Sequence, residues 1–176
     1  MARIERADGN PRGRGPAGSA RWTLSLPPVE AALVASLPDQ LAALLADPDQ
    51  NKRIIDRLFP QSYVDAEQER EHRGMLGRSL LEERREMVTA VRAVLAGGAR
   101  SRRSLALLLD AAGLDLLLRF INDTRLVLAT ELGVDRNLAD IVVDPASPDA
   151  PRFTLLVYLG GLEALIVEAL IGDPGT

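Results

Sequence analysis

The sequence predicts an all-α protein, a helical bundle of about six helices. Apolar residues recur at helical spacing from Pro27 to the C-terminal end, and Gly and Pro residues separate the helical stretches. Aromatic residues make up only 3% of the chain while hydrophobic residues make up 47%, so the core must be aliphatic. A chain of 176 residues is the length of one domain and can bury a sufficient core without disulfides.

The first 26 residues differ from the rest. They hold five arginines against two acidic residues, which gives this segment a local charge of +3. Residues 2–6 and 21–26 alternate polar and apolar side chains on either side of a Gly- and Pro-rich stretch, a pattern typical of a β-hairpin. A disordered arm is the alternative. We therefore divide the chain into a basic N-terminal arm or short β-hairpin, 1–26, and a helical bundle domain, 27–176.

The first helices are bounded by prolines. Pro28 suits a first helical turn, where its missing N–H costs nothing, and the helix ends at Asp47-Pro48. Pro38 must kink or restart this helix because it removes a backbone donor. A short helix follows over Asp49–Leu58 and ends before Phe59-Pro60.

Glycines separate the remaining predicted helices. The longest helix opens at Asp65 and ends at Ala96, where Gly97-Gly98 is a stop signal. The other three predicted helices run from a cap at Ser101 or Ser104 to Ala112, from Asp115 to Leu132, and from Arg152 to Ile171.

The helices Asp115–Leu132 and Arg152–Ile171 are apolar almost all round. Such helices are normally buried, and two of them exceed what one small bundle can cover. We therefore expect a homodimer through apolar helices, with a seam that includes 153–171, where Gly160-Gly161 permits close backbone approach.

Residues 153–171 also approach the length of a membrane span. Glu163 and Glu168 argue against that interpretation, because a single span offers an acidic side chain no partner. The first 20 residues contain no apolar stretch that could serve as a secretory signal. We expect a cytoplasmic protein that does not contact a membrane.

The sequence offers little catalytic chemistry. With no cysteine there is no disulfide, thiolate metal site or thiol nucleophile. His72, the only histidine, lies among surface charges, and the acidic residues 65, 67, 69 and 71 alternate between opposite helix faces. The glycines at 13, 15 and 18 lack the residues of a phosphate loop. We therefore predict no catalytic residue, no metal and no cofactor, and interpret the chain as not an enzyme.

Arginines form the densest basic patch, a candidate contact for an anion or a nucleic acid. A solvated interhelix loop is the alternative, and the net charge of −4 supplies no general attraction for nucleic acid. The helix after the patch is too apolar to read bases. The patch comprises Arg84, Arg85, Arg92, Arg100, Arg102 and Arg103.

Four polar residues interrupt the apolar helix that follows: Arg119, Asn122, Asp123 and Arg125. Asp123 is four residues from Arg119 and can pair with it. Polar residues on a buried helix usually fix packing register, so we interpret the four as a structural cluster. A small polar pocket is the functional alternative.

Three short motifs carry a resemblance: LPPVEA at 26–31, LFPQSY at 58–63 and NDTRLVL at 122–128. They resemble an actinobacterial all-helical family of unknown function that is commonly encoded near the ClpS protease adaptor, and the similarity extends from about Trp22 to Leu170. Some members are labelled transcriptional regulators, with redox sensing by a cysteine pair proposed. Because this chain has no cysteine, that switch cannot operate here.

The residues and the resemblance together predict a non-catalytic cytosolic interaction or regulatory protein. It would form a homodimer, and the dimer would bind an unidentified protein partner. The alternative is a DNA-binding transcriptional regulator that uses the arginine-rich arm and the Arg100–Arg103 patch.

Overall fold

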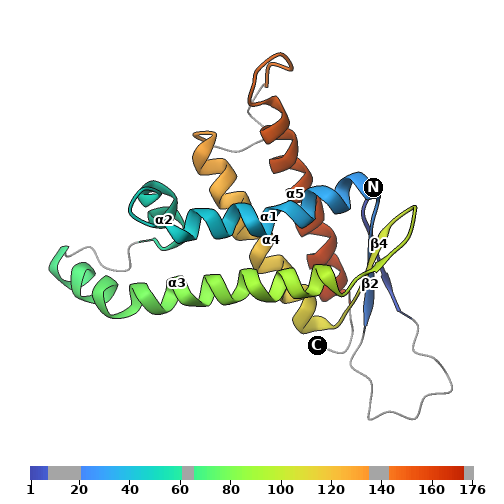
Figure 1. Ribbon diagram of the computed structural model, residues 1–176, viewed down its shortest axis with the longest axis horizontal. Helices are drawn as coiled ribbons and strands as arrows, with labels where there is room; N and C mark the ends of the chain where they lie inside the picture. The colour runs from blue at the N-terminus through green and yellow to red at the C-terminus, as the bar shows by residue number, and fades with distance from the viewer. Residues whose placement is uncertain (8–20, 61–65, 135–142, 173–176) are drawn as a thin grey trace, which may run out of the picture.

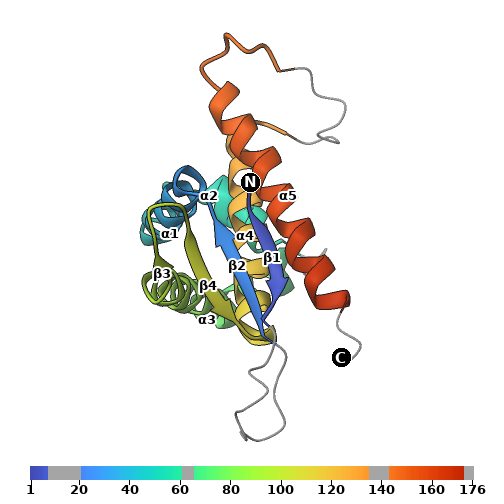
Figure 2. The same ribbon diagram turned by 90° about the vertical axis from the view of Figure 1, so that its right-hand side faces the viewer.

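The computed structural model describes residues 1–7, 21–60, 66–134 and 143–172, with backbone alone for residues 66 and 68–76. Within these ranges the chain forms five helices, which lie on one side of a four-stranded antiparallel sheet (Figures 1 and 2). In chain order the elements are β1 (Arg3–Arg6), β2 (Trp22–Leu26), α1 (Pro28–Ala46), α2 (Lys52–Leu58), α3 (Ala66–Ala96), β3 (Ala99–Arg100), β4 (Leu105–Leu109), α4 (Ala111–Glu131) and α5 (Ala150–Ile171).

The sheet has the strand order β1-β2-β4-β3. The predicted pairing of residues 2–6 with 21–26 is confirmed, with Arg3 opposite Ser25 and Arg6 opposite Trp22. Strand β2 then pairs with β4, so that Trp22 lies opposite Leu109 and Leu26 opposite Leu105. The N-terminal strands therefore share a sheet and a core with the centre of the chain.

The prediction of a purely all-α fold with six helices was wrong at residues 101–112. This segment forms most of the β3–β4 hairpin, and Leu105, Leu107 and Leu109 alternate into the core. Leu108, which shares a face with Leu105 in a helix, is instead 59% exposed on the outer face of the sheet. A run of five apolar residues has no period that distinguishes a strand from a helix.

Helix α4 begins earlier than expected and runs through Gly113. The side chain of Asp110 caps it, since Oδ1 accepts a hydrogen bond of 2.8 Å from the Gly113 N–H. Gly113 thus lies in the first turn and does not break the helix. Helix α1 likewise continues through the buried Pro38, so the helix does not restart there.

The predicted stop at Gly97-Gly98 is confirmed, and it brings the chain tightly over β4. A Cβ atom added at Gly98 would lie 2.5 Å from the side chains of Leu105 and Leu107. Only glycine allows this approach without displacing its neighbours.

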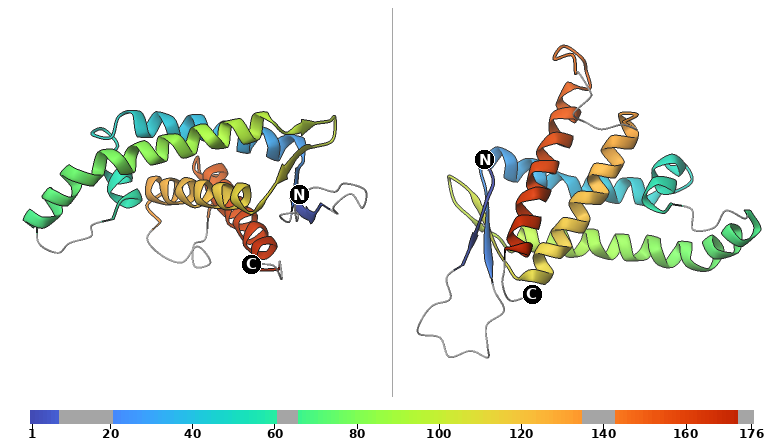
Figure 3. Two further views of the ribbon diagram at one scale, coloured as in Figure 1. Left: turned by 90° about the horizontal axis from the view of Figure 1, so that it is seen from below. Right: turned by 180° about the vertical axis from the view of Figure 1, so that it is seen from behind.

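The helices form two layers behind the sheet, with α1 beside α3 and α4 beside α5 (Figure 3, left). Helix α4 is central, because it also packs on α2 and α3. The largest fully buried side chains of the described residues are leucines and isoleucines apart from Phe120, and Trp22 is also buried, so the core is mainly aliphatic, as the composition predicted. Helix α5 crosses the back of the molecule and contacts α4 and β1 (Figure 3, right).

Candidate functional site

Three of the six arginines in the predicted patch bind residues within the fold. Arg84 Nε lies 2.5 Å from Asp123 Oδ2 on α4. Arg85 donates a hydrogen bond of 2.9 Å to the Leu45 carbonyl in the last turn of α1. Arg92 donates to Asp39 Oδ1 through Nε at 3.0 Å and Nη2 at 2.7 Å. These side chains connect α3 to its neighbours.

The other three arginines, Arg100, Arg102 and Arg103, lie exposed at the β3–β4 turn. Ser101 Oγ shapes this turn by accepting hydrogen bonds from the backbone N–H groups of Arg103 and Ser104. The strand register places Arg100 at the end of the sheet opposite to Arg6. The arginine turn and the start of the basic segment after β1 therefore lie apart, and nothing is described of residues 8–20.

The four polar residues of α4 have different surroundings. Asp123 is buried against Arg84, and Arg119 forms a surface ion pair with Asp115 at 2.9 Å in place of the expected pair with Asp123. Asn122 is exposed. Arg125 forms an ion pair with Glu163 of α5. The four residues therefore share one helix but do not form one cluster.

Burial raises the pKa of Asp123 above its ordinary value of 3.8, while the nearby Arg84 and Arg119 charges act in the opposite direction. Arg84 also lies 5.5 Å from the centre of the Phe59 ring. Its contact with Asp123 is an ion pair without the alignment of a good hydrogen bond. At the α3–α4 contact, the charge of Arg84 thus offsets part of the cost of burying the Asp123 carboxylate.

Gly160 lies next to the Arg125 guanidinium, which pairs with Glu163 of α5. A Cβ atom added at Gly160 would be 3.5 Å from the Arg125 guanidinium, whereas one added at Gly161 meets nothing within 4 Å. The two glycines that the sequence grouped together thus have different environments. Gly160 faces α4, and Gly161 lies on the outer face of α5.

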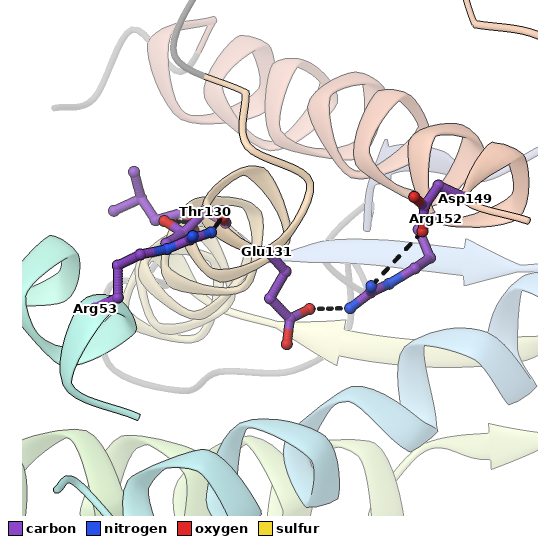
Figure 4. A network of polar contacts seen from close by, with 6 residues as sticks. Arg53, Thr130, Glu131, Asp149 and Arg152 are labelled. Atoms are coloured by element: carbon purple, nitrogen blue, oxygen red, sulfur yellow. Dashed lines mark hydrogen bonds and ion pairs between the residues drawn. The ribbon is translucent and has the colours of Figure 1, made fainter. Parts of the chain in front are cut away.

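Polar contacts hold the end of α4 against α2 and against the start of α5. Arg53 of α2 donates to the Thr130 carbonyl at the end of α4, and Arg152 pairs with Glu131 and lies 3.9 Å from Asp149 (Figure 4). Further along α5, the Tyr158 hydroxyl donates to Glu30 Oε2, which also accepts from the Ala2 N–H at 2.8 Å. Sequence reasoning missed Glu30 because its partners are far away along the chain.

The outer face of α5 has two of the exposed large apolar side chains of the described residues. Val157 and Ile171 are 63% and 77% exposed, and both are apolar. The exposed residues of α5 between positions 154 and 171 recur every three or four residues: Thr154, Val157, Gly161, Ala164, Glu168 and Ile171. We call this set the α5 stripe.

An apolar groove opens beside the start of the α5 stripe. Its volume is about 690 Å³, and Thr154 and Val157 of the stripe are part of its wall. The segment before α5 provides the opposite wall through Val143, Pro145 and Pro148. The Pro-rich segment before the helix is evident in the sequence, but no local pattern predicts that it forms a groove with α5.

Helices α1 and α5 are each long and apolar enough to cross a membrane, by length and composition alone. The apolar window is 33% buried in α1 and 22% buried in α5. A core helix of a soluble protein passes the same test, so the finding is weak evidence for a membrane. A smaller share of the residues is buried in the α5 window than in the α1 window.

Within the described ranges, no group of three or more His, Asp or Glu side chains is placed to hold a metal ion. The side chain of His72 and most of the acidic run from 65 to 71 lie outside the described residues. Asp123 and Thr124 are the buried polar residues of the described part, and the Thr124 hydroxyl donates to the Phe120 carbonyl at 2.8 Å.

In a comparison with protein families, residues 7–170 match a family model described as a domain of unknown function. None of the curated proteins matches the chain. No solved structure matches it either. The geometry of the surface is therefore the basis for a functional conclusion.

Proposed function

Because the chain belongs to the DUF2017 family, a domain of unknown function, we propose its role from its surface: a non-catalytic interaction or regulatory protein of the cytoplasm that acts as a homodimer. The dimer forms through α5, and a protein partner binds the assembled dimer. The observation that carries this proposal is the α5 stripe, in which the large apolar side chains of Val157 and Ile171 are exposed.

Burial of the stripe is the physical reason for association. Contiguous apolar surface is uncommon on monomeric proteins and usually marks an interaction site. Val157 and Ile171 lie on one face of α5, and the apolar groove continues that face beyond the start of the helix. In a dimer with a two-fold axis beside α5, the same surface of each subunit is buried.

Helix α5 alone is too small for a stable interface. Its 22 residues span about 33 Å, and a strip about 10 Å wide covers roughly 330 Å², against about 800 Å² per partner in a standard interface. The groove wall at residues 143–151 adds adjacent apolar surface. We therefore include the groove in the dimer seam.

The polar residues of the core support a non-catalytic role. Asp123 is paired with Arg84, and Thr124 bonds to its own helix, so both serve the packing of α4. A catalytic site needs convergent titratable groups at a concave surface. The groove beside α5 has apolar walls and two hydroxyl groups, Ser147 and Thr154.

The mass of the protein in solution tests this proposal. Light scattering at micromolar concentration should give twice the chain mass of 19.0 kDa. Val157→Asp places a charge in the seam and should give the monomer mass. Val29→Asp is the matched control, because Val29 is also exposed but lies on α1, and this variant should remain dimeric. A monomeric wild-type protein overturns the proposal.

A second candidate function is DNA binding through the β3–β4 turn. Arg100, Arg102 and Arg103 are exposed there, and their side chains have no ion pair within the described ranges. Three phosphate contacts would give log affinity a slope of about −2 to −3 against log salt concentration. The net charge of −4 opposes this role.

A gel shift with random duplex DNA at low salt tests the second candidate. Arg102→Glu/Arg103→Glu should abolish a shift caused by the turn, whereas Arg78→Glu, an exposed position on α3, should not. No shift at low salt excludes DNA binding by this turn.

A further inference from the structure

We infer that the second copy packs on α5 in antiparallel orientation and that Ile171 of the partner subunit enters the groove at the start of α5. This inference rests on the proposed homodimer and specifies its geometry. It assigns an occupant to the groove and a binding role to Ile171.

The spacing of the α5 stripe is that of a helix–helix seam. Positions 154, 157, 161, 164, 168 and 171 alternate steps of three and four residues, and all six are exposed. This alternation keeps a seam on one side of a helix and is how two long helices pack lengthwise. The seam ends at Thr154 on one side and at Ile171 on the other.

The charge of Glu168 selects the antiparallel orientation. In a parallel pair, each stripe residue meets its own copy, so the two Glu168 carboxylates face each other in an apolar seam. In an antiparallel pair centred between Gly161 and Ala164, Glu168 lies opposite Val157 of the partner subunit. The two carboxylates are then eleven residues apart along the seam, about 16 Å, which exceeds the screening length at physiological salt.

The same register places Ile171 of the partner subunit opposite Thr154, which lines the groove. Ile171 is 77% exposed in the isolated chain. The groove of about 690 Å³ has space for a branched side chain, and its walls at Val143, Pro145 and Phe153 are apolar. Two-fold symmetry produces this insertion twice, once at each end of the seam.

The centre of the seam has small residues on both helices. Gly161 lies opposite Ala164 of the partner subunit, and a Cβ atom added at Gly161 meets nothing within its own chain. Two helices with small residues at their crossing can approach closely. The large apolar residues then contact each other toward the ends, where the groove is located.

A lipid bilayer is the competing occupant of the α5 stripe. Glu168 lies within the stripe, and a carboxylate in the hydrocarbon of a bilayer has no contact with water, whereas a carboxylate in a seam one helix wide can reach solvent at the edge of the seam. Glu163 does not reach that surface freely, because it pairs with Arg125. These contacts favour a second protein surface over lipid.

Cysteine cross-linking tests the orientation, and the chain has no native cysteine to interfere. The double variant Val157→Cys/Glu168→Cys should form covalent dimers on mild oxidation or with a short bis-maleimide. Each single variant should not, because like positions lie about 16 Å apart in this register. The control is Glu82→Cys/Ala93→Cys, two exposed positions on α3 that are also eleven residues apart. This variant should not form covalent dimers.

The outcomes separate the inference from the proposed function. Covalent dimers of Glu168→Cys alone indicate a parallel pair and overturn the inference while the homodimer stands. A dimeric protein in which no α5 cysteine reacts also overturns it, because another face then forms the seam. A monomeric wild-type protein overturns both.

The groove contact has its own test. Ile171→Ala should weaken the dimer and raise its dissociation constant about a hundredfold, which is tenfold for each of the two symmetric sites. Phe153→Ala should act in the same direction, with urea denaturation confirming that each variant folds. An unchanged dissociation constant for Ile171→Ala overturns the insertion. Co-flotation of the wild-type protein with phosphatidylcholine–phosphatidylglycerol vesicles, abolished by Val157→Asp, assigns the stripe to lipid and also overturns it.

Discussion

Arg84 and Arg92 lie two turns apart on α3 and form ion pairs of very different burial. Asp123, the partner of Arg84, has a side chain that is 6% exposed, whereas Asp39, the partner of Arg92, is 79% exposed. Removing one member of a buried pair leaves an uncompensated charge, which is strongly destabilising. Removing one member of an exposed pair changes little, because water replaces it.

Arg84→Met should therefore lower the free energy of unfolding at pH 7 by about 3 kcal/mol. Arg92→Met, the matched control on the same helix, should lower it by less than about 1 kcal/mol. Urea denaturation of the wild-type protein and both variants measures the difference. Equal losses for the two variants would show that the Arg84–Asp123 pair is not a buried interaction.

The loss in Arg84→Met should also depend on pH. Because burial raises the pKa of folded Asp123 above 3.8, the folded state binds the proton more tightly than the unfolded state. Stability from this carboxyl is complete below its unfolded pKa and is lost as the pH rises through the folded pKa. Arg84 opposes that shift, so its removal should cost more at pH 7 than at pH 4. A penalty that grows toward pH 4 contradicts this assignment.

The destinations of these arginines could not be predicted from the sequence. The composition and spacing identified a dense group of arginines, but Arg84, Arg85 and Arg92 each bind a residue about 40 or more positions away. Such contacts depend on the packing of α3 against α1 and α4. The exposed α5 stripe was easier to foresee, because an apolar helix with few polar positions already indicated uncovered surface.

At the level of elements, the junction between α3 and β3 depends on Gly98. Gly98→Ala should destabilise the protein by about 2 kcal/mol, because the added methyl group would lie 2.5 Å from the side chains of Leu105 and Leu107. Gly97→Ala is the control, since its nearest neighbour would lie at 3.4 Å. Thermal and urea denaturation of both variants measure the two effects. A Gly98→Ala variant as stable as Gly97→Ala would show that the leucines can move aside.

Most elements followed from local sequence signals, and the error at residues 101–112 has a local cause. Prolines, glycines and helical periodicity located α1, α2, α3 and α5 within a few residues. The LALLL run of β4 consists of good helix formers, and it forms a strand because it pairs with β2 along its whole length and with β3 at its start. That pairing joins segments about 80 residues apart, which no local pattern can reveal.

At the level of the whole molecule, two faces remain open after the core has formed. The helices cover one face of the sheet, and the outer face holds Leu108 and small or polar residues. Helix α5 lies on another side of the molecule (Figure 3, right), and its stripe includes the exposed side chains of Val157 and Ile171. An interaction protein needs surface for both assembly and recognition. We assign α5 to assembly, which leaves the sheet face and the arginine turn for a partner.

Dimerisation through α5 should make thermal stability depend on protein concentration. Association stabilises only the folded state, so each tenfold increase in chain concentration adds about 0.7 kcal/mol per chain and raises the melting temperature by about 2 °C. Val157→Asp should abolish this dependence, whereas Val29→Asp should retain it. Differential scanning calorimetry over a hundredfold concentration range measures the shift. A melting temperature that stays constant for the wild-type protein would mean that the chain unfolds as a monomer and that its α5 stripe is open to solvent.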